Sequence, residues 1–336
     1  MSSFPKVSVI IPCRNEERFI GLVLQALYDQ SYPIKEMEVL IADGFSEDRT
    51  REVIADFSDK HPELKVRVLD NEAQIIPAAL NICLKEAKGE YIVRMDAHSI
   101  PNREYVEISV RELETGKGSN VGGIWEIKSR SSGWFSRGIA AAMRNPFGVG
   151  DAKYRYTKEA SYVETVPFGA FKRELIDQIG FFDETLLTNE DYEFNHRIMK
   201  AGGKIWLNPE IRSEYYARPD LKSVWKQYWR YGYWKLKMLI RFPESLKLRQ
   251  AIPPLFVLSM IVLLVGALVW DPMRWLLFME VVSYWVILSI SGIKSAIDDN
   301  EALHLISVPI TIITAHFSWG SAFLFSLLEN LFSGKK

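Results

Sequence analysis

The feature that most constrains this chain is an uneven distribution of charge along its length. Residues 251–336 carry ten charged side chains, whereas residues 1–250 carry 73. Three apolar stretches lie in the weakly charged part, at 252–270, 275–293 and 305–328. A helix needs about 20 apolar residues to cross the hydrocarbon core of a bilayer. The sequence therefore predicts a polar globular part that is followed by two to three membrane helices.

The three apolar stretches differ in how clearly they predict membrane spans. The first has no charged residue, the second has only Glu280, and the segment 271–274 between them predicts a tight turn. Together they predict a hairpin of two membrane helices. The third stretch is interrupted by Pro309, His316 and Gly320. A buried helix and a re-entrant or interfacial segment therefore stay open beside a third span.

Basic residues predict which side of the membrane faces the N-terminal part. Residues 7–12 are too short an apolar run for a signal peptide, and charged residues follow directly. Positive charge favours the cytosolic side of a membrane helix. We therefore expect a multi-pass protein of the inner (plasma) membrane whose first 250 residues lie in the cytosol, with the side of the C-terminus open. The basic residues before the first stretch are Lys235, Lys237, Arg241, Lys247 and Arg249.

Composition excludes several classes of protein. Apolar residues make up 48% of the 336 residues, too many for a disordered chain. The net charge of −1 gives no support for nucleic-acid binding. The two cysteines, Cys13 and Cys83, match neither a disulfide framework nor a zinc-binding spacing. We expect a reducing compartment and no nucleic-acid partner.

The first hundred residues alternate between apolar strands and amphipathic helices. We expect strands at 7–11, 38–42, 66–69 and 91–95, with helices at 17–28, from Ser46 and Asp48 to about residue 59, and from about residue 77 to Gly89. This rhythm predicts an α/β fold with a parallel, doubly wound sheet. Ligands bind such sheets at the carboxyl ends of the strands, where the strand order reverses.

Polar residues follow three of these strands, at 12–16, at Asp43-Gly44 and at Asp96-Ala97-His98. Neither the GxGxxG fingerprint nor the GxxxxGK[ST] loop is present, which disfavours dinucleotide binding and a glycine phosphate loop. Carboxylates can hold a diphosphate only through a divalent cation. The sequence therefore predicts a nucleotide pocket that uses a metal ion. Each segment alone is also typical of an ordinary turn.

The order of these segments resembles the family 2 glycosyltransferases of the GT-A fold. The resemblance covers residues 5 to about 240. The sequence around Asp96-Ala97-His98, residues 147–150 and the apolar tail look most like the membrane-anchored, succinoglycan-type glucosyltransferases of bacterial exopolysaccharide assembly. The segments that carry the resemblance are 7–12 with Asn15-Glu16, 42–50, 96–98, 169–174, 180–184 and 189–191.

The resemblance implies roles for residues at the strand ends. Pro12, Arg14 and Glu16 would line the nucleoside pocket, and the Asp43 carboxylate would accept from the N3–H of uracil. Asp96 would bind the nucleotide through the metal ion, and Asp96 with His98 would be the metal ligands. His98 replaces the second Asp of the family's motif, and because imidazole is a softer ligand than carboxylate, Mn²⁺ gains over Mg²⁺.

Asn189-Glu190-Asp191 precedes a predicted helix, and Asn189 or Asp191 could simply cap it. The resemblance instead makes Asp191 the general base of an inverting transfer, in which one base deprotonates the acceptor hydroxyl. Glu190 would cap the helix or orient the acceptor.

Residues 212–250 combine ten basic residues with an aromatic stripe. This pattern is typical of a helix in the lipid headgroup layer, although a solvated face over a packed core stays open. Gln227, Arg230 and Tyr231 resemble the Gln-x-x-Arg-Trp motif of processive synthases, which implies contact with the acceptor or a diphosphate. Residues 131–156 predict an acceptor-side loop that touches lipid or, equally, a packed insertion.

These observations predict a cytosolic catalytic domain at 1–211, interface helices at 212–250 and a membrane domain at 251–336. The expected activity is inverting transfer of a hexose from a UDP-sugar to a polyprenyl-diphosphate-linked saccharide at the cytosolic membrane face. Two alternatives stay open. One is sugar transfer to polyprenyl phosphate itself, and the other is a non-catalytic nucleotide-sugar-binding partner of a polysaccharide synthase.

Overall fold

The computed structural model describes residues 4–149, 152–245 and 248–332, and for residues 149, 248 and 249 it describes the backbone only. Gly150, Lys247 and the Arg249 side chain, which entered the sequence analysis, lie outside this description. The chain forms two compact units. The N-terminal unit comprises Met1–Glu126 and Lys153–Tyr215, and the C-terminal unit comprises Ile127–Ala152 and Tyr216–Lys336. The sequence did not predict that the segment 127–152 belongs with the C-terminal unit.

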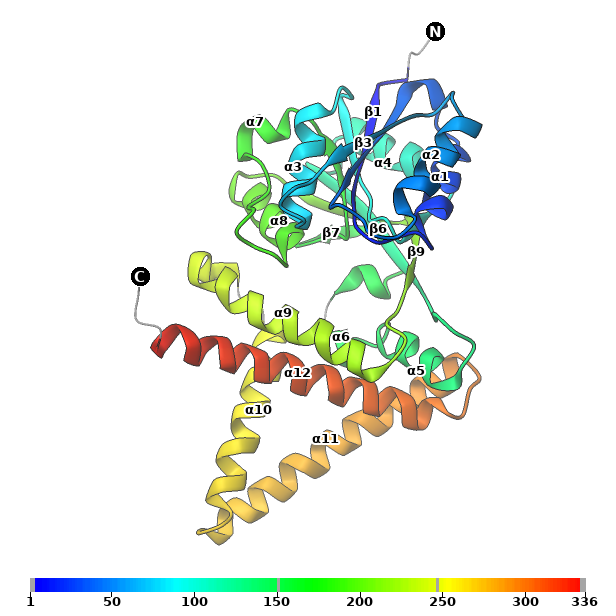
Figure 1. Cartoon of the computed structure of the whole chain (residues 1–336). Helices are drawn as coiled ribbons and strands as arrows, with labels where there is room; N and C mark the ends of the chain where they lie inside the picture. Colours follow the sequence, from blue (N-terminus) through cyan, green and yellow to red (C-terminus); the bar gives the residue numbers. More distant parts are fainter. Residues whose placement is uncertain (1–3, 150–151, 246–247, 333–336) are drawn as a thin grey trace. The chain divides into compact units, whose positions relative to one another are not determined.

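Four parallel strands form the first half of the sheet in the N-terminal unit, in the order β3-β2-β1-β4 (Figure 1). Each expected strand is present, and helices connect the strands as the apolar periodicity predicted. The strand order reverses between β1 and β4. The elements are β1 (Val7–Cys13), α1 (Ile20–Tyr28), η1 (Ile34–Glu36), β2 (Met37–Asp43), α2 (Thr50–Lys60), β3 (Lys65–Asp70), α3 (Ile76–Glu86) and β4 (Tyr91–Arg94).

The second half of the sheet is antiparallel, which the strand-helix rhythm of residues 7–96 did not indicate. Its strands follow β4 in the order β8-β6-β9-β5, and β7 pairs with β9. Strands β6 and β9 continue from the N-terminal unit into the C-terminal unit. The elements are β5 (Ser99–Pro101), α4 (Tyr105–Glu114), β6 (Asn120–Lys128), η2 (Lys153–Arg155), β7 (Ser161–Val163), β8 (Ala170–Lys172), α7 (Leu175–Ile179), α8 (Glu190–Lys200) and β9 (Ile205–Tyr216).

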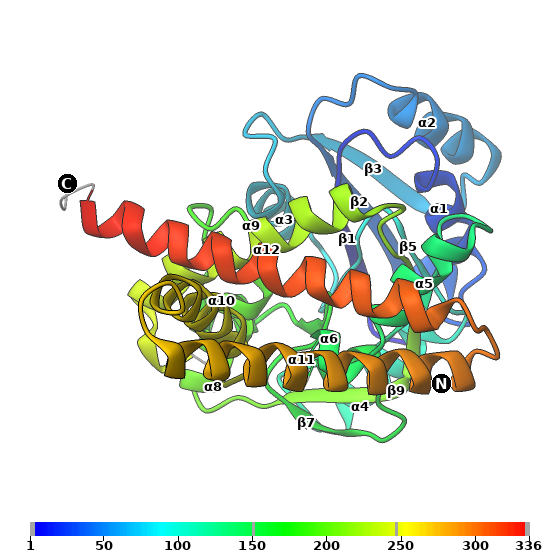
Figure 2. The same cartoon turned by 90° about the horizontal axis from the view of Figure 1, so that it is seen from below.

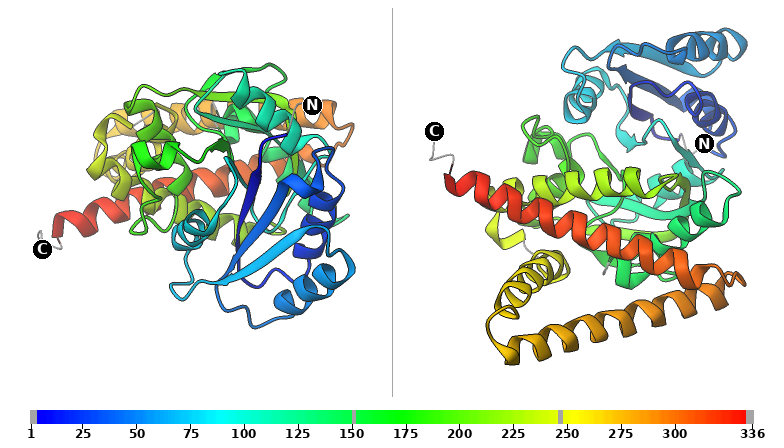
Figure 3. Two further views of the ribbon diagram at one scale, coloured as in Figure 1. Left: turned by 90° about the horizontal axis from the view of Figure 1, so that it is seen from above. Right: turned by 60° about the horizontal axis from the view of Figure 1, so that its bottom comes forward.

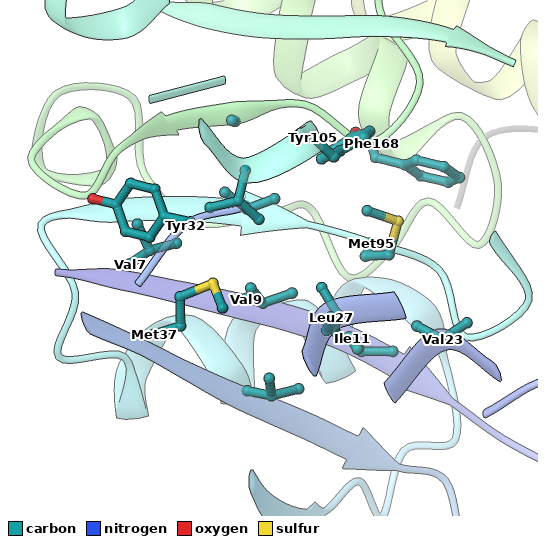
Figure 4. Close-up of a cluster of buried hydrophobic side chains, with 14 of the residues drawn as sticks. Val7, Val9, Ile11, Val23, Leu27, Tyr32, Met37, Met95, Tyr105 and Phe168 are labelled. Atoms are coloured by element: carbon teal, nitrogen blue, oxygen red, sulfur yellow. The ribbon is translucent and has the colours of Figure 1, made fainter. Parts of the chain in front are cut away.

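The β1 side chains fill a hydrophobic core on each face of this sheet. Val9 and Ile11 pack with Leu27 of α1 on one face (Figure 4). Ile10 points to the other face and belongs to the core that includes Phe171 of β8. Apolar residues at consecutive positions therefore mark β1 as a strand that is buried on both faces.

The C-terminal unit is built from helices. The hairpin formed by α10 and α11 matches the first two apolar stretches, and α12 matches the third (Figure 1). By length and composition α11 and α12 could each cross a membrane, whereas the apolar part of α10 is shorter, at 250–266. The elements are α5 (Trp134–Ala142), α6 (Pro146–Val149), α9 (Leu221–Arg241), η3 (Pro243–Ser245), α10 (Leu248–Gly266), α11 (Asp271–Asp298) and α12 (His304–Phe332).

Two details of these apolar helices differ from the sequence prediction. The chain turns at 267–270, and α11 already begins at Asp271, because Asp271 and Pro272 suit the first turn of a helix. Helix α12 continues through Pro309 and Gly320. Gly320 serves packing, since a Cβ there would lie 2.5 Å from the carbonyl oxygen of Pro253.

Candidate active site

A pocket of about 180 Å³ lies at the carboxyl ends of β1 and β4. This is the place where the strand order reverses, as expected for a ligand site in such a sheet. Four residues predicted to bind the nucleotide, Pro12, Arg14, Glu16 and Asp96, line the pocket together with His98. The rest of the lining is Cys13, Gly44, Asn71, Gln74, Ile75, Ile76, Ala79 and Ala97.

The loop after β1 is held in place by residues that precede α2. The backbone N–H of Asn15 donates to Ser46 Oγ at 2.8 Å, and the N–H of Glu16 donates to Thr50 Oγ1 at 2.8 Å. Asn15 adopts a positive φ of 54°, a conformation that Asn tolerates better than most residues. These bonds fix the direction in which the Glu16 side chain leaves the backbone.

Asp43 lies beneath the pocket and is fully buried. Its carboxylate accepts from the Ser46 hydroxyl at 2.5 Å, from the Ser46 N–H at 3.1 Å and from Arg51 Nε at 2.6 Å. Arg51 also reaches Asp70 at 2.6 Å. Asp43 therefore organises the loop at 43–51, and it is absent from the residues that line the pocket.

Asp96 and His98 lie together in the pocket, and Glu16 joins them from the β1 loop. The Glu16 Oε1 atom is 2.9 Å from His98 Nδ1. Metal-bound imidazoles are commonly held by such a carboxylate. Among the residues that the structure describes, no group of three or more His, Cys, Asp or Glu side chains is arranged as a metal site. The pair Asp96 and His98 therefore fits a cation that takes its other ligands from a bound diphosphate or water.

Arg94, at the end of β4, connects the pocket to α8. Its guanidinium Nη2 atom is 2.8 Å from Glu190 Oε1 and 3.5 Å from Asp96 Oδ1, and the side chain is only 3% exposed. Burial alone would lower the pKa of Arg94, but the carboxylates of Glu190, Asp96 and Asp191 raise it. Arg94 is therefore a permanent positive charge within a group of three carboxylates.

Asp191 follows Glu190 in the first turn of α8. Its withdrawal from water and the adjacent Glu190 carboxylate raise the pKa of Asp191 to about 6, while Arg94 acts in the opposite direction. A carboxyl group with this pKa is mostly ionised at neutral pH and is more basic than an ordinary aspartate. Asn189 occupies the N-cap position, but its side chain makes no capping hydrogen bond.

Sequence reasoning missed Arg94. The signal was a single charged residue within the apolar segment 91–95. A buried charge must have a partner, so an arginine in such a strand points to a carboxylate that the fold brings close. The partner, Glu190, lies 96 residues further along the chain and belongs to another element.

The remaining predicted residues lie on α9 in the C-terminal unit. Gln227 is buried and its Nε2 atom donates to the Tyr231 hydroxyl at 3.0 Å, whereas Arg230 is exposed. The exposed face of α9 also carries Lys222, Trp225 and Lys226. Of the predicted aromatic stripe, Trp225 is exposed beside these basic residues, whereas Trp229 and Tyr233 are half-buried and contact α12.

Comparison with known sequences gives the pocket a context. The model of the family described as "Glycosyl transferase family 2" matches residues 8–180. A dolichyl N-acetyl-α-D-glucosaminyl phosphate 3-β-D-2,3-diacetamido-2,3-dideoxy-β-D-glucuronosyltransferase of Methanococcus voltae is 31% identical over 67% of this chain and 71% of that protein. The succinoglycan biosynthesis protein ExoA of Rhizobium meliloti is 31% identical over 73% of each chain.

Solved structures share the fold. The mannosyltransferase PcManGT of Pyrobaculum calidifontis, solved with GDP-Man and Mn²⁺, is 19% identical and covers 99% of this chain and 89% of its own, with a TM-score of 0.61. Residues 1–349 of S. aureus TarS, solved with UDP-GlcNAc, are 15% identical and cover 96% and 92% of the two chains, with a TM-score of 0.50. The chain covers 40% of full-length TarS. The N-terminal unit therefore has the GT-A fold that the resemblance implied.

Proposed function

Because the chain belongs to glycosyltransferase family 2, we propose that it is an inverting, metal-dependent enzyme that transfers a hexose from a UDP-sugar to a polyprenyl-diphosphate-linked saccharide. The reaction takes place at the cytosolic face of the inner membrane and serves exopolysaccharide or cell-surface glycan assembly. One relative named above is named for a dolichyl-linked sugar phosphate, which supports a lipid-linked saccharide as the acceptor. The other is named for succinoglycan biosynthesis, which supports a role in polysaccharide assembly.

One observation carries the proposal: Arg94 joins the pocket residue Asp96 to the Glu190-Asp191 pair. Sugar transfer needs a place for a departing diphosphate and a base for the incoming hydroxyl, close enough to act on the same sugar. One guanidinium nitrogen of Arg94, Nη2, contacts both Asp96 at 3.5 Å and Glu190 at 2.8 Å, which holds the two groups close to each other. A non-catalytic protein that only binds the nucleotide sugar would need the pocket but not the adjacent Glu190-Asp191 pair.

Asp96 and His98 would hold the divalent cation, which when bound supplies the positive charge that stabilises the departing diphosphate. The Glu16 carboxylate orients the His98 ring for this role through the 2.9 Å contact. PcManGT, of the same fold, was solved with Mn²⁺. A set of one carboxylate and one imidazole favours Mn²⁺ over Mg²⁺ compared with a pair of carboxylates.

Asp191 acts as the general base. Its carboxylate takes the proton of the acceptor hydroxyl as that oxygen forms a bond to the anomeric carbon and the bond to the diphosphate oxygen breaks. The electron pair of the broken bond leaves with the nucleoside diphosphate. A single displacement of this kind inverts the anomeric centre and needs no carboxylate nucleophile, unlike retaining hydrolysis.

Recognition of uracil through Asp43 requires a rearrangement. The Asp43 carboxylate is fully buried, does not line the pocket and already accepts from Ser46 and Arg51, so the residues that cover it must move before the base can donate its N3–H. TarS, solved with UDP-GlcNAc, and PcManGT, solved with GDP-Man, hold different bases in the same fold. The donor assay must therefore include both nucleotides.

Nucleotide release from a panel of UDP- and GDP-sugars tests the proposal in membranes that contain the protein. We expect UDP release that requires Mn²⁺ or Mg²⁺ and a lipid-linked saccharide, that EDTA abolishes, and that Asp96→Asn reduces by at least about 100-fold. Asp59→Asn, an exposed change on α2, is the matched control. Transfer to polyprenyl phosphate alone would favour the other acceptor, and donor binding without release would favour the non-catalytic partner.

The cation preference has a test of its own. His98→Asp gives the pocket the carboxylate pair of the family's usual motif. We expect the ratio of activity in Mn²⁺ to activity in Mg²⁺, at matched low concentration, to fall in this variant. An equal ratio in wild type and variant would remove His98 from the set of metal ligands.

A further inference from the structure

Helix α12 lies across the open end of the hairpin in the C-terminal unit (Figure 1). A Cβ on Gly292, near the end of α11, would lie 3.2 Å from Pro309 of α12. Gly320, further along α12, is in similarly close contact with Pro253, near the start of α10. Helix α12 therefore contacts the last turns of α11 near its own start and the first turns of α10 further along.

Helix α12 also lies alongside α9, and the two helices run in the same direction (Figures 2 and 3). Ser318 Oγ donates to the Trp225 carbonyl oxygen at 2.6 Å, and the Tyr233 hydroxyl donates to Glu329 at 2.6 Å. A Cβ on Gly232 would lie 2.3 Å from the Trp319 carbonyl oxygen. The two helices thus form one closely packed pair.

Helix α9 is too polar to cross a bilayer. Its exposed basic side chains lie at both ends and in the middle, and each would cost about 3 kcal/mol at the centre of a membrane. Because α12 runs beside α9 from Trp225 to Lys237, α12 cannot cross unless α9 crosses with it. The exposed basic residues are Lys222, Lys226, Arg230 and Arg241.

Charged residues mark both ends of the hairpin. At the end of α11, Asp299 pairs with Arg144 at 2.8 Å and Glu301 pairs with Arg137 at 2.6 Å, which ties this end to α5. At the tip, the exposed residues Trp270 and Trp275 flank the charged first residues of α11, 271–274. Tryptophan beside a charged turn is typical of a membrane–water interface.

The length of α11 is sufficient for a full crossing, and α10, with 19 residues, is close to the minimum. Helix α11 has 28 residues, a length of about 42 Å, against a hydrocarbon core of about 30 Å. The only acidic residue inside the second apolar stretch, Glu280, accepts from the Ser259 hydroxyl of α10 at 2.5 Å. The hairpin thus satisfies this polar group internally.

The last turns of α12 are amphipathic. Their large apolar side chains are exposed and follow one another at three- and four-residue intervals, whereas Glu329 is turned to Tyr233 and Lys237 of α9. A helix of this pattern suits the boundary between headgroups and acyl chains. The exposed apolar residues are Phe325, Leu327, Leu328, Leu331 and Phe332.

We propose that the α10–α11 hairpin crosses the bilayer and that α12 does not. Helix α12 lies along the membrane in the near leaflet, with its apolar C-terminal face in lipid. The end of the chain is then on the same side of the membrane as the N-terminal unit, and the hairpin tip is on the opposite side. The protein has two spans, although α12 is apolar and long enough to be a third.

Labelling of introduced cysteines tests this topology. The full-length protein carries Arg274→Cys at the tip, Asn330→Cys at the end of α12, or Lys60→Cys on the exposed surface of α2 as the reference for the N-terminal unit. The native Cys13 and Cys83 are buried and give a low background. A membrane-impermeant maleimide is added to spheroplasts and, separately, to inside-out vesicles of the expressing bacterium.

We expect Arg274→Cys to react in spheroplasts and both Asn330→Cys and Lys60→Cys to react in inside-out vesicles, each with a labelling ratio of at least about tenfold between the two preparations. Reaction of Asn330→Cys on the same side as Arg274→Cys would show three spans and overturn the proposal. Reaction of all three on one side would show a re-entrant hairpin and overturn it too. Fusion of a compartment-sensitive reporter after residue 332 gives a second measurement that needs no cysteine. Neither the labelling nor the reporter measurement depends on sugar transfer, so the topology is tested separately from the proposed function.

Discussion

The two units depart from the usual placement of side chains in opposite ways. The N-terminal unit buries charged groups: Arg94 is 3% exposed and Asp43 is fully buried. The C-terminal unit exposes apolar groups: Leu268 is 76% exposed and Val269 is 87% exposed. Buried charges in the first unit are paired with one another, whereas the exposed apolar side chains of the second form a surface that suits a lipid environment. In each unit, the side chains that depart from the usual placement are those that the proposed function uses.

The largest effect is expected from Asp191→Asn, which removes a charge that the proposed chemistry needs. We expect kcat to fall about 10²- to 10⁴-fold, the usual contribution of a general base, with little change in donor affinity. Nucleotide release and binding of the nucleoside diphosphate measure the two quantities. Lys200→Ala, at the far end of α8, is the control. Normal turnover in Asp191→Asn would remove the residue from the mechanism.

Arg94→Met tests whether the buried charges depend on one another. Loss of the guanidinium leaves Glu190 and Asp96 without their shared partner, which costs about 3–5 kcal/mol for a buried pair. We expect a lower melting temperature and a lower kcat/KM. Arg94→Lys keeps the charge but not the forked geometry, so it should fall between Arg94→Met and wild type. If Arg94→Met matched wild type in both quantities, the link between the pocket and α8 would have no function.

An apolar residue changed to arginine in each unit tests whether its surroundings are water or lipid. Leu22 on α1 is 51% exposed and Ile261 on α10 is 50% exposed. Leu22→Arg should change stability by less than about 0.5 kcal/mol, as is usual on a water-exposed surface. Ile261→Arg should cost about 2.5–3.5 kcal/mol of insertion free energy and reduce the fraction of protein that remains in carbonate-washed membranes. Ile261→Leu is the matched control, and equal behaviour of the two arginine variants would contradict a lipid environment for α10.

The smallest effect concerns pH. Because the folded protein raises the pKa of Asp191 to about 6, the carboxyl group is protonated, and unable to accept a proton, below that pH. We expect kcat/KM to be level at neutral pH and to fall about tenfold per pH unit on the acid side of about pH 6. The residual activity of Asp191→Asn should lack this acid limb. A wild-type profile that falls only near pH 4 would place the base elsewhere.

The sequence predicted those features that depend on local pattern. Apolar runs indicated the parallel strands, and polar residues at their ends indicated Arg14, Glu16, Asp96 and His98, which the fold gathers in one pocket. The position of a ligand site at the carboxyl ends of parallel strands can be predicted from the order of strands and helices alone.

Features that depend on distant partners were not predicted. Arg94 acquires its role from Glu190, which lies 96 residues further along the chain. Helix α12 has the composition of a span, and only its packing against α9 and the hairpin argues against a crossing. Composition reports how apolar a helix is, but its direction in the membrane depends on its neighbours.

The passage of β6 and β9 from one unit to the other has a consequence for protein production. Removal of everything after residue 215 would leave the segment 127–152 attached to β6. Helix α5 in that segment would then lose its packing against α12. Gly138 of α5 is in such close contact with Ser307 of α12 that a Cβ would lie 1.9 Å from the Ser307 hydroxyl oxygen. A shortened enzyme that is soluble without detergent would therefore have to lose both 127–152 and the residues after 215. A single cut at 215 would leave the apolar face of α5 exposed and prone to aggregation.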